Sequence, residues 1–133
     1  MIDIKPYVDN RNIKDLIGQC LYDPSQDKIN EVINSYLSND KYLLLGHKED
    51  NEIAGYIGLD LTYPLKTIIK HIAVKEERRN TGIGRKMIIS CLLDYEISEI
   101  EVETDDDALN FYKKLGFNVA NTEYKYDNVR RSH

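Results

Sequence analysis

The fold of this chain is decided by an apolar stretch and the turn that follows it, which read TIIKHIAV and KEERRNTGIGR over residues 67–85. The first eight residues are rich in β-branched side chains and carry only two strongly polar ones, Lys70 and His71. This composition predicts a central strand covered on both faces. The apolar spacing from Ile83 to Cys91 predicts a helix buried against a sheet. A strand, a glycine-spaced turn and a helix in this order indicate an α/β domain.

The rest of the chain supplies helices and strands around this unit. The periodicity predicts a strand at 2–4, helices at 13–20 and 29–37, an antiparallel hairpin at 42–45 and 53–61, a strand at 97–104, a helix at 108–115 and strands at 117–119 and 122–126. The order β-α-α-β-β-β-α-β-α-β-β describes an α/β sandwich, a mixed central β-sheet flanked by helices on both sides. A right-handed crossover should make strands 67–74 and 97–104 parallel neighbours. The tail 130–133 is expected to be frayed.

Length and charge limit the classes of function. The 133 residues fit one domain spanning 1–133, and 18 Lys and Arg against 23 Asp and Glu give a net charge of -5. An acidic surface should repel nucleic acid and anionic membrane. No apolar run approaches the ~18 residues of a membrane span, and Cys20 and Cys91 stand alone, as expected of free thiols in a reducing compartment. These features predict a cytoplasmic protein with no nucleic-acid or membrane partner.

Chemistry is expected in the turn from Arg78 to Arg85. A helix N-terminus offers unpaired N–H groups and a positive dipole end to an anion. Gly82 and Gly84 have no Cβ, so the backbone there can approach a phosphate closely. Arg78, Arg79 and Arg85 add positive charge in an acidic protein, and the turn suits a pyrophosphate.

Two common phosphate motifs do not fit this turn. A dinucleotide fingerprint needs a third glycine where Met87 stands, and the chain has no Gly-Lys-Ser or Gly-Lys-Thr of a P-loop. An isolated Gly-x-Gly is also explained by a helix start in which the glycines serve only the turn.

The surrounding pattern is more specific. Its parts are Ile72-Ala73-Val74, then Arg79-x-x-Gly82-x-Gly84, then Ala108-x-x-Phe111-Tyr112-x-x-Leu115-Gly116-Phe117. Together, over 67–117, they resemble the Gcn5-related N-acetyltransferase superfamily, whose cosubstrate is acetyl-CoA. The resemblance implies that the pyrophosphate is held by Arg79, Asn80, Thr81, Gly82, Ile83, Gly84 and Arg85. It also implies that the segment Ile72, Ala73 and Val74 binds the pantetheine arm, with backbone groups of Ile72 and Val74 pairing with it as with an extra strand.

The catalytic groups are less clearly marked. Tyr112 falls where the family has a tyrosine near the thioester, and a phenol with a pKa of ~10 is a sensible proton donor to a thiolate; the alternative is core packing beside Phe111. Glu103 is either the base or part of a solvated strand face, and His71 is either a titrating group or a structural one. Asp105 departs from the asparagine of many relatives, and a carboxylate can only accept hydrogen bonds.

No metal is required by this chemistry. Asp105, Asp106 and Asp107 are explained by the start of a helix. Cys20 and Cys91 each lie on a buried helix stripe, so neither is expected to carry an acyl group.

The leading hypothesis is an N-acetyltransferase that moves an acetyl group from acetyl-CoA to a primary amine by direct transfer in a ternary complex. The acidic charge favours a cationic acceptor: a polyamine, an aminoglycoside or a peptide amine. One alternative is a non-catalytic acyl-CoA-binding module that senses the cofactor. Another is an interaction protein that uses the fold as a scaffold. The C-terminal strands offer an edge through which two subunits could pair as a homodimer.

Overall fold

The computed structural model describes residues 1–64, 66–95, 100–103, 118–120, 123–125 and 129–132. Its helices are α1 (Arg11–Gly18), α2 (Gln26–Leu37) and α3 (Ile83–Asp94), with short 3₁₀ turns η1 (Lys5–Tyr7) and η2 (Glu76–Arg78). Its strands are β1 (Ile2–Asp3), β2 (Tyr42–Glu49), β3 (Glu52–Asp60), β4 (Thr67–Val74), β5 (Ile100–Glu103), β6 (Asn118–Ala120), β7 (Glu123–Lys125) and β8 (Val129–Ser132). The predicted helix at 108–115 lies outside the described residues.

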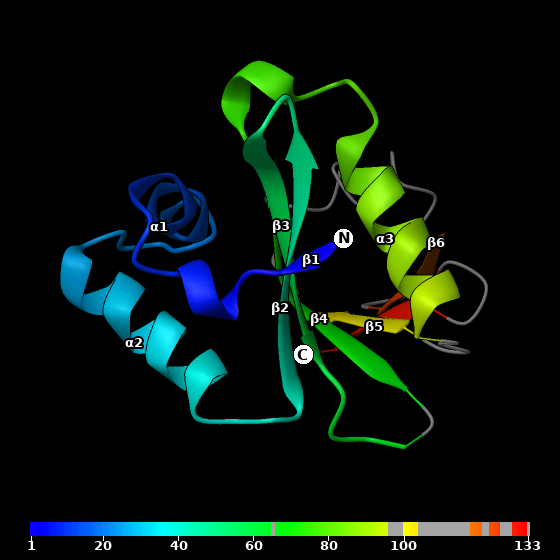
Figure 1. Ribbon diagram of the computed structural model, residues 1–133. Helices are drawn as coiled ribbons and strands as arrows, with labels where there is room; N and C mark the ends of the chain where they lie inside the picture. Colours follow the sequence, from blue (N-terminus) through cyan, green and yellow to red (C-terminus); the bar gives the residue numbers. More distant parts are fainter. Residues whose placement is uncertain (65, 96–99, 104–117, 121–122, 126–128, 133) are drawn as a thin grey trace.

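The strands form a mixed sheet of six, in the order β1-β2-β3-β4-β5-β8, with β6 and β7 in a separate pair (Figure 1). The first four strands are antiparallel, and β5 runs parallel to both β4 and β8. The predicted parallel pairing of the strands before and after α3 is therefore confirmed. The expected frayed tail is wrong, because Val129–Ser132 pairs with Ile100–Glu103 as β8. Backbone hydrogen bonds hold this strand, so it needs no apolar pattern of its own.

The hairpin of β2 and β3 is longer and its turn tighter than predicted. Asp50 and Asn51 have φ of 53° and 65°, and Glu49 pairs with Glu52 across them. Two consecutive residues in the left-handed region make the two-residue turn that matches the twist of antiparallel strands. The polar residues on either side of this turn therefore belong to the strands.

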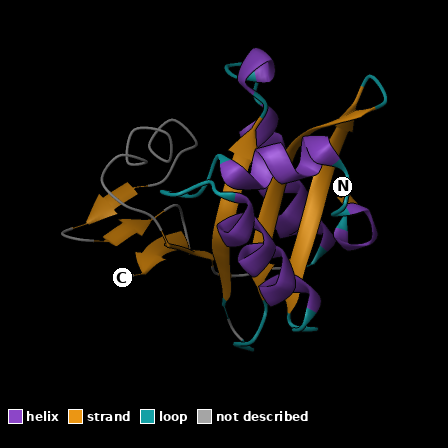
Figure 2. Cartoon of the chain, turned by 90° about the vertical axis from the view of Figure 1, so that its left-hand side faces the viewer, coloured by secondary structure: helices purple, strands orange, loops and turns teal. Residues whose placement is uncertain are grey.

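Helices cover both faces of the sheet, as predicted. In Figure 1 α1 and α2 lie on one side and α3 on the other, and Figure 2 shows α1 and α2 in front of the strands. Side chains of a strand alternate between faces: on β3, Tyr56 packs into the cluster under α1 and α2, while Ile57 packs into the cluster under α3. Both residues are 0% exposed. Because β3 is buried on both faces, its residues form a nearly continuous apolar run.

The first helix ends earlier than its apolar stripe suggested. α1 begins after Asn10, whose side chain caps the amides of Asn12 and Ile13, and it ends at Gly18. Cys20 lies in the turn beyond, where its amide bonds Ile17 O at 3.2 Å. This i to i−3 bond tightens the last turn, and so Cys20 does not continue the helix stripe.

Candidate functional site

The first part of the candidate site is the start of α3. Gly82 is its N-cap, with φ of 85° and no side-chain cap, and the first bond back to it is Lys86 N to Gly82 O at 3.0 Å. The amides of the first turn have no partner within their own helix, so those of Ile83, Gly84 and Arg85 point out of its end. A Cβ built on Gly82 would meet nothing within 4 Å. Open space therefore lies beside Gly82, at the end of the helix that carries these N–H donors.

The second part is an open edge of β4. The ladder between β4 and β5 ends at the pair Ile69–Val102, whereas β4 continues to Val74. The register between β3 and β4 shifts at Gly58/Leu59, because Lys70 is an extra residue in β4. Such a bulge bends the strand and ends regular pairing, often next to active sites. Beyond the bulge, β4 has β3 as its neighbour on one side only within the described part of the chain.

The direction of the backbone groups on this edge follows from the ladder. Lys75 N donates to Ala54 O at 2.8 Å, so residue 75 faces β3. Antiparallel pairs alternate between hydrogen-bonded and non-bonded, and so Ala73, opposite Tyr56, also faces β3. The backbone groups of Ile72 and Val74 therefore face the open edge, whereas Ala73 does not offer its own there.

Side chains from other elements already contact two of these carbonyl groups. Cys20 Sγ donates to Ile72 O at 3.3 Å, and Arg79 Nε donates to Val74 O at 3.2 Å. The terminal nitrogen of Arg79 also reaches Gln19 Oε1 at 2.9 Å. The end of α1 and the turn before α3 thus meet across the open edge of β4.

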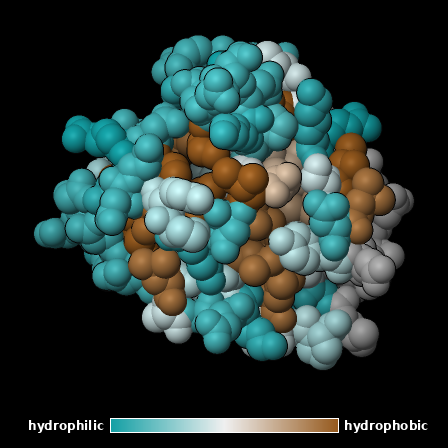
Figure 3. All heavy atoms as spheres, in the orientation of Figure 1, coloured by the Kyte–Doolittle hydropathy of each residue, from teal (hydrophilic) through white to brown (hydrophobic). Residues whose placement is uncertain are grey.

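The arginines of the turn do not share one role. Arg78 is paired with Asp50 at 3.0 Å and with Glu52 at 3.2 Å, both from the β2–β3 hairpin. These acids raise the pKa of Arg78, and hydrogen bonds from Lys75 and Arg78 lower the pKa of Glu52. Figure 3 shows hydrophilic side chains over this upper end of the molecule. The expectation that Arg78, Arg79 and Arg85 together offer positive charge is reduced to Arg79 and Arg85, which are both exposed and have no ion pair in the described part of the chain.

Asn80 and Thr81 shape the turn. Asn80 has φ of 65°, and Thr81 Oγ1 donates to Arg78 O at 2.5 Å. An asparagine tolerates the left-handed region better than most side chains. Their contribution to this turn is local backbone geometry.

Both thiols are shielded. Burial raises the pKa of Cys91 to about 12, with the charge of Asp94 adding to it. Burial also raises the pKa of Cys20, against hydrogen bonds to Tyr56 and Ile72 that lower it. The two thiols are reduced, and Cys91 is buried.

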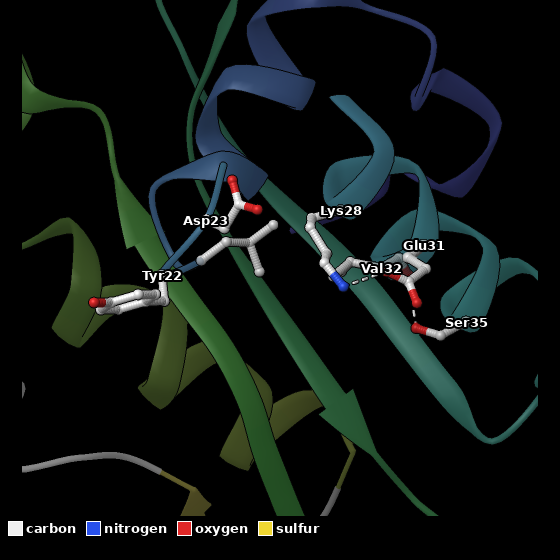
Figure 4. A pocket seen from close by; sticks show the side chains of 7 residues that line it. Tyr22, Asp23, Lys28, Glu31, Val32 and Ser35 are labelled. Carbon is white, nitrogen blue, oxygen red and sulfur yellow. Dashed lines mark hydrogen bonds and ion pairs between the residues drawn. The ribbon is translucent and has the colours of Figure 1, made fainter. Parts of the chain in front are cut away.

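A surface hollow of about 470 Å³ lies between the α1–α2 connection and α2 (Figure 4). Leu21, Tyr22 and Asp23 form one wall, directly after Cys20, and the other wall is formed by Lys28, Glu31, Val32 and Ser35. Lys28 and Glu31 form an ion pair at 3.3 Å. Leu21 of this hollow directly follows Cys20, whose thiol contacts Ile72 O of β4.

Several predicted site residues lie outside this description. Tyr112 and Asp105 are outside the described residues, and of Glu103 only the backbone is described, in β5 next to Ser132 of β8. No group of three or more His, Cys, Asp or Glu side chains in the described ranges could hold a metal ion. None of the described helices is long and apolar enough to cross a membrane.

The family model for the acetyltransferase (GNAT) domain matches residues 18–132. The chain belongs to the GNAT acetyltransferase family. A crystal structure of a GNAT family acetyltransferase from Elizabethkingia anophelis with acetyl-CoA bound is 30% identical, with a TM-score of 0.63 over 80% of this chain and 69% of that one.

Two further GNAT-fold structures are similar. An IAA acetyltransferase from Bacillus cereus is 27% identical, with a TM-score of 0.59 over 80% of this chain and 70% of that one. An aminoglycoside 6'-N-acetyltransferase complexed with coenzyme A is 17% identical, with a TM-score of 0.64 over 90% of this chain and 86% of that one, and it supports the fold alone. No curated protein sequence matches the chain significantly.

Proposed function

We propose that this GNAT protein transfers an acetyl group from acetyl-CoA to a primary amine. The observation that carries the proposal is the open edge of β4, which runs from the bulge at Lys70 to the Gly82 turn at the start of α3. Unpaired strand donors followed by a helix N-terminus suit an extended polar arm that ends in a pyrophosphate.

The cofactor arm pairs with the amides of Ile72 and Val74 in this proposal. Its pyrophosphate lies on the first-turn amides of α3, with Arg85 as the nearby exposed cation. Arg79 holds the Val74 carbonyl and the end of α1 in place. In this proposal the motif residues Gly82–Arg85 bind the pyrophosphate through their backbone amides. Arg79 instead stabilises the site through its side chain.

Transfer proceeds directly between the two substrates in a ternary complex. The amine attacks the thioester carbonyl, and an N–H of the β4 edge stabilises the developing oxyanion. Tyr112 gives the leaving thiolate its proton, and Glu103 attracts the incoming cationic amine or deprotonates it before attack. Cys91, with a pKa of about 12, stays protonated at neutral pH and is a poor acyl carrier.

The acceptor is a cationic amine, such as a polyamine, an aminoglycoside or a peptide amine. The net charge of -5 attracts cations, and Asp23 and Glu31 place carboxylates at the hollow between the α1–α2 connection and α2. The two free thiols suit the cytoplasm, and β8 at the edge of the sheet offers a surface for a homodimer.

An amine panel tests the proposal. Purified protein is mixed with acetyl-CoA and each amine, and release of CoA thiol is followed, while calorimetry measures CoA binding. Thiol release that depends on a primary amine is the expected result. CoA binding without release would favour a sensing module instead, and absence of CoA binding would favour a scaffold.

A further inference from the structure

Tyr36 of α2 and His71 of β4 form a hydrogen-bonded pair on the face of the sheet that α1 and α2 cover. Tyr36 Oη lies 2.6 Å from His71 Nδ1, and Tyr36 is 0% exposed. Gly58 pairs with His71 across the strands, and a Cβ on Gly58 would clash with the Tyr36 hydroxyl. The missing side chain of Gly58 therefore admits the hydroxyl that reaches His71.

The pair lies at the inner end of the open edge. His71 directly follows the bulge residue Lys70, where the β4–β5 ladder has ended, and it precedes Ile72, whose backbone faces the opening. A strand rises ~3.3 Å per residue, so His71 is about 10 Å along β4 from Val74. A cofactor arm anchored at the Gly82 turn and running along β4 brings its reactive end toward the bulge.

The surroundings keep the imidazole neutral. Burial, and next the charge of Lys70, lower the pKa of His71 to about 4. Lys70 itself lies over the Tyr42 ring, 4.7 Å from the centroid, and Tyr36 contacts both Tyr42 and His71 edge-on or tilted at 5.8 Å. Nε2 of His71 has no hydrogen-bond partner in the described part of the chain. The lone pair of Nε2 is therefore not used by a hydrogen bond within the described chain, and the packed Tyr36 fixes the orientation of the imidazole ring.

We propose that His71 accepts the proton of the acceptor amine and that Tyr36 positions it, a role that rests on the proposed N-acetyltransferase function. The amine nitrogen bonds to the carbonyl carbon and the C–S bond breaks. The proton leaves the positively charged nitrogen for Nε2 while Nδ1–H donates to Tyr36 Oη. The thiolate takes a proton from its own donor, and the imidazolium returns its proton to solvent. A weaker base serves at this step than a free ammonium would need, because a nitrogen bonded to the carbonyl carbon is more acidic than a free ammonium.

Four proteins test this role: wild type, His71→Asn, Tyr36→Phe and the control Tyr42→Phe. The control also removes one hydroxyl from the same aromatic group, and in the described chain that hydroxyl makes no hydrogen bond. Calorimetric CoA affinity should be the same for all four. His71→Asn should lower kcat about 100-fold and remove the acid limb of the kcat–pH profile. Tyr36→Phe should lower kcat about tenfold at unchanged amine KM, and Tyr42→Phe should stay within about twofold.

Each outcome is decisive. If wild type gives no amine-dependent thiol release, the proposed function and this role fail together. If wild type is active and a folded His71→Asn keeps both kcat and the pH profile, only the role of His71 is overturned. Loss of CoA affinity together with a lower melting temperature in His71→Asn would make the residue structural, and the role would again be wrong. If that variant does not fold, an unchanged kcat in Tyr36→Phe overturns the role.

Discussion

Arg79 Nε donates to the carbonyl of Val74 at 3.2 Å, so the arginine of the glycine-rich turn binds the protein's own strand. The same side chain reaches Gln19 at the end of α1. The planar guanidinium can make both contacts because its donors point in fixed directions. Arg79 therefore joins three segments around the open edge of β4.

Replacing Arg79 should weaken cofactor binding through lost positioning. Arg79→Lys keeps the charge but not the forked geometry, and we expect acetyl-CoA affinity to fall about tenfold by calorimetry. The matched control is Arg78→Lys, whose charge is taken by Asp50 and Glu52 and which should change affinity by less than about twofold. Equal losses in the two variants would contradict this division of roles.

Gly82 tests the open space before α3. Its φ of 85° makes Gly82→Ala strained by about 1 kcal/mol, which urea unfolding measures. Gly82→Asn should be less destabilised because asparagine tolerates this conformation. Both side chains would extend into the open space beside the start of α3, where we propose that the pyrophosphate lies, so both should lower CoA affinity at least about tenfold. An asparagine variant with wild-type affinity would show that no ligand approaches here.

Gly58 tests the packing under α2. A Cβ there would overlap the hydroxyl of the fully buried Tyr36, and Gly58→Ala should cost about 3 kcal/mol or more of unfolding free energy. At Gly18 the nearest atom is the flexible end of Ile29, at 3.2 Å. Gly18→Ala should therefore change stability by less than about 1 kcal/mol. Similar losses of unfolding free energy in Gly58→Ala and Gly18→Ala would contradict the close packing of Tyr36 against Gly58.

The buried imidazole predicts a pH dependence of stability. The folded state lowers the pKa of His71 from 6.5 to about 4, so the unfolded chain binds the proton more readily. The stabilisation is complete above pH 6.5 and is lost as the pH falls toward about 4. His71→Asn should remove this part of the acid limb when urea unfolding is compared at several pH values. If the difference in unfolding free energy between wild type and His71→Asn stays the same from pH 7 to about pH 4, this pH dependence is not due to His71.

Local patterns were sufficient for most of the described fold. The β-branched run at Thr67–Val74 became β4, and the apolar spacing from Ile83 became α3. The alternation of elements predicted helices on both faces and the parallel β4–β5 pair. These features depend on the period of apolar residues within one segment. A helix or strand that is buried on one face or on both has a recognisable pattern of apolar residues.

The contacts that shape the site join residues far apart in the sequence. Arg78 finds Asp50 across 28 positions, Cys20 finds Ile72 across 52, and Arg79 finds Gln19 across 60. No local pattern indicates such partners. The sequence of the turn therefore predicted more unpaired positive charge than the structure shows, because Arg78 is paired with acidic side chains of the β2–β3 hairpin. Strand β8 was missed for a related reason, since its partner is the backbone of β5.

The sequence by itself therefore determined the order of elements, the strand-turn-helix unit and its glycine-spaced start, because each arises from neighbouring residues. Only the tertiary structure decided which backbone groups of β4 stay open, which arginine of the turn is paired with acidic side chains, and that Tyr36 meets His71 over Gly58. The physical reason is that hydrogen bonds and ion pairs act over a few ångströms. Which groups come that close depends on how the whole sheet and its helices pack.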